Sequence, residues 1–163
     1  MPILVGSIQY EKEVLFGQAL APYLAREDTI FVISSDFCHW GSRFSYTFYY
    51  PDPDSDISSR LSRSNLPSTA YPIHKSIKRL DHEGMDVLST SPGTFAHKKF
   101  KDYLSRTRNT ICGRHPIGVL MGALGTMEQE RDVEIKWVKY AQSSACVNVS
   151  DSSVSYASAW IRF

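Results

Sequence analysis

Apolar residues near the start of the chain form two short continuous runs separated by a helical period. The runs at residues 3–6 and 29–34, the second rich in β-branched and aromatic side chains, each predict a buried strand. Between them, residues 12–25 place five apolar residues on one helical face: Phe16, Ala19, Leu20, Tyr23 and Leu24. Strand, helix and strand in this order predict a βαβ unit and a parallel sheet.

Helical periods return in the second half of the chain and give way to strands near its end. Apolar spacing predicts helices over about 73–88, 92–104 and 116–124. Val133, Ile135 and Trp137 alternate with charged residues, which predicts a half-buried strand, and the slip of this alternation at Val138 predicts a bulge or burial on both faces. A last strand is expected from the apolar residues between 154 and 160.

The remaining segment, at about 50–72, is rich in Ser, Pro, Asp and Arg and has no apolar period, so we expect a mobile surface loop. We find no internal repeat and no domain boundary. Residues 1–163 are therefore expected to form a single α/β domain, with a mixed, largely parallel sheet flanked by helices.

Composition narrows the class of protein without identifying a function. A net charge of +1 gives no basic face for nucleic acid. No apolar run approaches the ~20 residues that span a bilayer, and no signal peptide precedes the first run. Three cysteines without a CxxC pair favour neither a disulfide framework nor a zinc ribbon. A reducing, cytoplasmic setting is expected.

Three residues with reactive side chains follow the strand predicted at 29–34: Asp36, Cys38 and His39. Ligands of open α/β sheets bind beyond the carboxyl ends of the strands, which suits metal or acid–base chemistry here. Neighbouring residues on extended backbone point to opposite sides, so only one of Cys38 and His39 faces a pocket. We assign His39 to the pocket, because a free cysteine often behaves as a small buried hydrophobe. The alternative is a structural histidine.

Cys112 precedes a predicted helix that Pro116 helps to start. The free N–H groups and dipole of a helix N-terminus stabilise a thiolate, and Arg114 and His115 add nearby cationic groups. These features predict a reactive or metal-binding cysteine, and the alternative is a buried cysteine at a helix cap. Cys146 has no nearby cations and is interpreted as structural.

The other histidines, His74, His82 and His97, lie in charged stretches and are interpreted as solvated surface residues. The sequence contains no GxGxxG or Walker segment, so no motif supports nucleotide binding. A GxSxG nucleophile elbow is also absent.

Four stretches of the chain resemble the Memo family: residues 32–41 (VISSDFCHWG), 109–118 (NTICGRHPIG), 140–144 (YAQSS) and 151–157 (DSSVSYA). Their order and spacing fit the family pattern across essentially the whole chain, and residues 50–72 depart from it most. The resemblance implies a fold similar to class III extradiol dioxygenases, which hold non-haem iron with two histidines and a carboxylate.

In the Memo family a cysteine takes the place of that carboxylate, and Cys112 matches it. His39 matches a further pocket histidine, Asp36 the acid beside it, and Arg114 and His115 belong to the same pocket. The two principal histidine ligands belong to the N-terminal half of the family chain, which we expect to be absent here. Cys112 and His39 then supply at most two ligands, so iron or copper would bind weakly.

The resemblance implies a metal-binding signalling or redox-regulatory protein linked to cell motility and cytoskeleton control, with protein partners and a cytoplasmic and secondarily nuclear location. This chain alone is not expected to be an enzyme. One alternative is a dioxygenase-like oxidoreductase in a longer form. Another is a short product with little activity of its own. The substrate and the oligomeric state are not indicated by the sequence.

Overall fold

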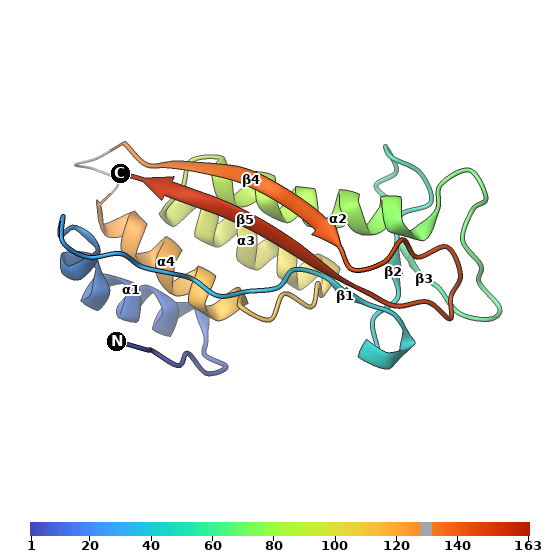
Figure 1. Ribbon diagram of the computed structural model, residues 1–163, viewed down its shortest axis with the longest axis horizontal. Helices are drawn as coiled ribbons and strands as arrows, with labels where there is room; N and C mark the ends of the chain where they lie inside the picture. The colour runs from blue at the N-terminus through green and yellow to red at the C-terminus, as the bar shows by residue number, and fades with distance from the viewer. Residues whose placement is uncertain (128–131) are drawn as a thin grey trace.

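The computed structural model describes residues 1–127 and 132–163. Helices stack beside one long antiparallel ribbon of two strands (Figure 1). α1 packs on α4, α4 on α3, α3 on α2, and α2 lies against the ribbon. The helices of the described residues are α1 (Tyr10–Leu24), α2 (Ile73–Ser89), α3 (Thr94–Thr107) and α4 (Arg114–Met127).

The ribbon consists of β4 (Glu134–Gln142) and β5 (Ser153–Arg162). β5 also pairs at its beginning with the short β1 (His39–Trp40), so the sheet order is β1-β5-β4 and both pairings are antiparallel. The β4–β5 register shifts between Trp137 and Lys139, which confirms a bulge at Val138. Residue Val138 is accordingly exposed.

The segment at 50–72 contains a strand of its own. β3 (Ser59–Arg60) pairs antiparallel with β2 (Phe48–Tyr49), and the 3-10 turn η1 (Ser42–Phe44) precedes β2. The backbone of Asn65 bonds to that of Ser62, which closes a further turn within the segment. Apart from Leu61, most of its side chains lie at the surface.

The α/β class is confirmed, but the expected parallel sheet is wrong. Residues 3–6 and 29–35 form no strand, and every strand pairing in the described residues is antiparallel. A parallel strand needs neighbours that bond its backbone, and neither run has one here. Ile30 is 90% exposed and Val32 is 86% exposed, so side chains typical of a buried strand face outward.

Helix α1 also buries a different face from the one predicted. Phe16 and Tyr23 are exposed, whereas the buried stripe is Glu13, Gly17, Ala21 and Leu24. A Cβ added at Gly17 would lie 2.5 Å from the backbone nitrogen of Ala123, so α1 and α4 touch through their backbones. This close approach decides which side of α1 is covered.

The described helices include none that is long and apolar enough to cross a membrane. The core lies where the helices meet the ribbon and the β1 region. Its largest fully buried side chains include Trp40, Tyr50, Phe100, Ile73, Ile77 and Leu80.

Candidate metal centre

Side chains from two distant parts of the chain meet beside β1 and the start of α4, Asp36 and His39 from one and Cys112 from the other. Asp36, His39 and Cys112 each offer one potential ligand atom, and these atoms all lie within 4.8 Å of one another. Nε2 of His39 lies 3.8 Å from Oδ2 of Asp36. In the described residues they form the one group of this kind among His, Cys, Asp and Glu.

The turn before α4 carries Cys112 directly under the segment that carries Asp36. The backbone N–H of Asp36 donates to Sγ of Cys112 at 3.1 Å, and the N–H of Gly113 donates to Oγ of Ser35 at 3.0 Å. A Cβ on Gly113 would lie 2.3 Å from the Cβ of Ser35, so only glycine fits at this crossing. Cys112 itself is exposed, which leaves its sulfur open to solvent and solutes.

The backbone of His39 is fixed by one side chain. Oγ1 of Thr110 accepts from the N–H of His39 at 2.7 Å and donates to its carbonyl oxygen at 3.0 Å. The imidazole lies 5.3 Å from the ring of Phe44. Nε2 of His39 is buried and has no hydrogen-bond partner among the described residues. A buried ring nitrogen without a partner is the atom expected of an imidazole that takes a ligand.

The buried carboxylate of Asp81 bonds to the residues that precede His39 and Thr110. Oδ1 of Asp81 accepts from the N–H of Cys38 at 3.2 Å and from Nδ2 of Asn109 at 3.1 Å. The hydroxyl of Tyr140 donates to Oδ2 at 2.8 Å. Burial raises the pKa of Asp81, although these hydrogen bonds act in the opposite direction. Asp81 thus ties together the residues that precede His39 and Thr110.

The thiol of Cys38 points into the core rather than toward the metal centre. It is fully buried, and burial raises its pKa well above the ordinary value, so it stays protonated. Cys146 is also buried, and burial raises its pKa as well. Cys112 is the one exposed cysteine of the chain.

The donor set fits a transition metal. Thiolate and imidazole suit iron, copper and zinc, and a carboxylate adds a harder ligand that suits iron. The sequence reasoning counted Cys112 and His39 as ligands, and the geometry adds the carboxylate of Asp36 as a third available donor. A bound ion would supply Lewis-acid or redox chemistry at this surface.

The side chains of Arg114 and His115 have partners other than Cys112. The guanidinium of Arg114 donates to the carbonyl of Ile111 at 3.3 Å, and Nδ1 of His115 lies 2.7 Å from Oε1 of Glu13. No hydrogen bond or ion pair joins either side chain to the sulfur within the described ranges. Cys112 therefore lies beside the start of α4, but Arg114 and His115 are bonded to other groups.

The interpretation of His97 as a surface residue is wrong. Its side chain is 2% exposed, and Nε2 lies 2.7 Å from Oε2 of Glu13. Glu13 thus joins His97 on α3 to His115 on α4. The signal was present in the helical spacing, because His97 lies three residues before Phe100 on the buried face of α3.

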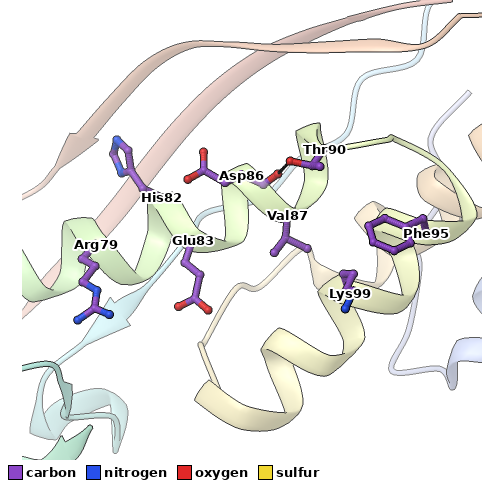
Figure 2. A pocket seen from close by; sticks show the side chains of 8 residues that line it. All are labelled: Arg79, His82, Glu83, Asp86, Val87, Thr90, Phe95 and Lys99. Atoms are coloured by element: carbon purple, nitrogen blue, oxygen red, sulfur yellow. Dashed lines mark hydrogen bonds between the residues drawn. The ribbon is translucent and has the colours of Figure 1, made fainter. Parts of the chain in front are cut away.

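A groove of about 480 Å³ lies between α2 and α3, away from the candidate ligands. Figure 2 shows that it is lined by charges of both signs, with Arg79 and Glu83 on α2 and Lys99 on α3. It includes none of the candidate ligands, so we assign it no part in metal chemistry.

Comparison with known proteins decides the family. A model of the family described as "Memo-like protein" matches residues 1–160. The chain belongs to the Memo-like family. Protein MEMO1 of Danio rerio is 41% identical over 158 residues and that of Homo sapiens 40%, in each case over 96% of this chain and 46% of the relative. A MEMO1 family protein of Schizosaccharomyces pombe is 41% identical over 162 residues, 98% of this chain and 50% of the relative.

The chain spans about half the length of the curated relatives it matches. The cluster of Asp36, His39 and Cys112 therefore lies within the part of the family sequence that this chain shares. For this chain, the activities and partners of a complete Memo-family protein are therefore proposals.

Proposed function

We propose that this chain carries the C-terminal share of a Memo-family metal site that binds iron or copper. The observation that supports it is the meeting of Asp36, His39 and Cys112, whose ligand atoms lie within 4.8 Å of one another. A thiol, an imidazole and a carboxylate that meet at one point match the donor types of redox-active metal sites. The unpartnered Nε2 of His39 adds to this argument.

The site is proposed to be completed by the other part of a Memo-type chain. The relatives are about twice as long as the shared segment, and the apolar run 29–35 lacks strand partners. A groove of about 490 Å³ lies beside this run and is lined by apolar residues of α4, β4 and β5, among them Ile117, Leu120, Ile135 and Trp137. Alone, the chain offers one histidine where non-haem iron sites have two, so we expect its affinity for metal to be modest.

The open edge of β5 supports the same proposal. The backbone of Phe37 donates to Ser155, and that of Ser155 donates to Cys38. Beyond these bonds no backbone hydrogen bond joins residues 30–35 to β5 in the described part of the chain. An added strand would bond the free groups of both edges and cover Ile30 and Val32.

The biological role proposed is metal-dependent signalling or redox regulation, linked to cell motility and the cytoskeleton, with protein partners. A dioxygenase-like oxidoreductase is the second candidate, because Cys112 is exposed and the three donor types match those of non-haem metal sites. Similarity of fold alone does not distinguish a regulatory protein from an oxidoreductase.

Turnover separates the two candidates. The chain is combined with the remaining part of a Memo-family protein and loaded with Fe(II) under anaerobic conditions. A catechol and oxygen are then added. Oxygen uptake matched by ring-cleavage product supports the oxidoreductase. Metal binding without turnover supports the regulatory role. If neither the chain alone nor the combined protein binds metal, the proposal as a whole is contradicted.

A further inference from the structure

A further cavity is lined in part by Asn109 and Thr110, and the side chain of Thr110 also bonds the backbone of His39. Its volume is about 510 Å³, and α1, α3 and the first turn of α4 form its walls. The apolar part of the lining consists of Ile8, Tyr10, Phe100 and Leu104. None of Asp36, His39 and Cys112 lines it, so the cavity is separate from the candidate metal centre.

Three cations line this cavity: Lys101, Arg108 and Arg114. Among the described residues, no carboxylate lies within ion-pair distance of any of them. The one acidic residue in the lining is Glu13. Three positive charges less one negative charge leave a net charge of +2, with the histidines left out of the sum.

Glu13 is already committed to other partners. Its two oxygens accept hydrogen bonds from His97 and His115, each at 2.7 Å. Burial raises the pKa of Glu13, but the hydrogen bonds and electrostatic interactions with the two histidines together lower it, so the net pKa lies below its ordinary value. The carboxylate is therefore ionised near neutral pH, and it does not neutralise the three cations.

The wall also contains polar atoms without partners. Nδ1 of His97 and Nε2 of His115 are buried and have no hydrogen-bond partner in the described residues. His97 lines the cavity with a side chain that is 2% exposed. Buried polar atoms are usually paired, so these two nitrogens add to the polar character of the wall beside the three cations.

We propose that this cavity binds a small organic dianion, whose oxyanion groups contact Lys101, Arg108 and Arg114. A ligand with two negative charges balances the net charge of the lining. The apolar wall leaves room for a short carbon skeleton beside the charged groups. Phosphate monoesters and short dicarboxylates share this chemistry, and tetrahedral and planar probes distinguish them.

The test measures binding of sulfate and of malonate to the purified chain by isothermal titration, after metal has been removed with a chelator that is then dialysed away. The variant Lys101→Gln removes one cation. Lys99→Gln is the matched control, because Lys99 lies on the same helix, also over an aromatic ring, but lines the groove between α2 and α3. Arg108→Asn is a second variant, since asparagine tolerates the positive φ of 56° at this position.

We expect Lys101→Gln and Arg108→Asn each to weaken binding of the preferred probe by roughly 10- to 100-fold, the usual scale of one hydrogen bond to a charged group. Lys99→Gln should leave it unchanged. Tighter sulfate identifies a tetrahedral oxyanion, and tighter malonate a dicarboxylate. Failure of both probes to bind below about 10 mM, or equal weakening by Lys99→Gln and Lys101→Gln, overturns the proposal. Because metal is excluded, either result leaves the proposed metal function untouched.

Discussion

The backbone nitrogen of Asp36 lies 3.1 Å from the sulfur of Cys112, although 76 residues separate the two along the chain. This contact brings the end of an extended segment onto the turn that starts α4. Thr110 holds His39 beside it, and the three potential ligands come together without any of them being buried in the core. The donor set is thus positioned by backbone hydrogen bonds and close glycine packing.

Alkylation should distinguish Cys112 from the other cysteines. Cys112 is exposed, whereas burial raises the pKa of Cys38 and of Cys146 and hides both sulfurs. With iodoacetamide near neutral pH, we expect Cys112 to react at least about tenfold faster than either. Peptide mass spectrometry over a time course measures the three rates. Equal rates for Cys112 and Cys146 in the folded chain would show that this cysteine is no more available than a core residue.

The contact between α1 and α4 depends on Gly17. A Cβ at this position would lie 2.5 Å from backbone atoms of α4, which cannot give way as a side chain can. Gly17→Ala should therefore lower the free energy of unfolding by about 1–3 kcal/mol, the usual cost of overpacking.

Gly6→Ala is the matched control for Gly17→Ala, because nothing lies within 4 Å of the added Cβ. Urea unfolding followed by circular dichroism measures both variants. A Gly17→Ala protein as stable as the Gly6→Ala protein would mean that the two helices do not touch as described.

Protonation of Glu13 should lower the free energy of unfolding of the chain at acid pH. Its pKa in the folded chain lies below the ordinary 4.5 because of the two histidine hydrogen bonds, in spite of burial. The folded state therefore binds this proton less readily than the unfolded state. The stabilisation is present above about pH 4.5 and is lost as pH falls through the lowered pKa.

The variant Glu13→Gln should unfold at lower temperature at pH 7 and should lose less stability between pH 5 and pH 3, on the basis of the same linkage. Glu11→Gln, an exposed neighbour on α1, should behave like the unchanged chain. Thermal scans across this pH range test both. If the melting temperatures of Glu13→Gln and of the unchanged chain fall in parallel as the pH is lowered, Glu13 is not the source of the acid dependence.

The apolar run at 29–35 should make the isolated chain self-associate. Val32 is 86% exposed beside an apolar groove and an unpaired strand edge, a combination that promotes pairing between chains. Val32→Lys should shift the chain toward monomer in sedimentation velocity. Val138→Lys is the control, because Val138 is 65% exposed at the bulge of β4 and does not line the groove. A chain that is monomeric without substitution would contradict the open-edge interpretation.

The sequence predicted α2, α3 and α4 well because their apolar periods mark the buried faces, whereas the period of α1 marked an exposed one. It drew attention to Asp36, His39 and Cys112 through a predicted strand end, a helix start and a family resemblance. It failed at 29–35, since a β-branched run records a preference for burial and does not supply the partner strand. It also missed Glu13, although Glu13, Gly17 and Ala21 recur at a spacing of four residues along the buried face of α1. A charged residue in such a stripe indicates a buried pair whose partners, here on α3 and α4, only the tertiary structure supplies.

The contribution of Cys112 to metal binding tests the central claim most directly. Cu(I) and Fe(II) affinities are measured under anaerobic conditions by competition with a chromophoric chelator, for the unchanged chain, Cys112→Ser and Cys146→Ser. We expect modest affinity in the unchanged chain and in Cys146→Ser. Cys112→Ser should weaken it by at least about 100-fold, since loss of a group that only orients a ligand already costs roughly 10- to 100-fold. Equal affinities for Cys112→Ser and Cys146→Ser, with both folded, would contradict the account.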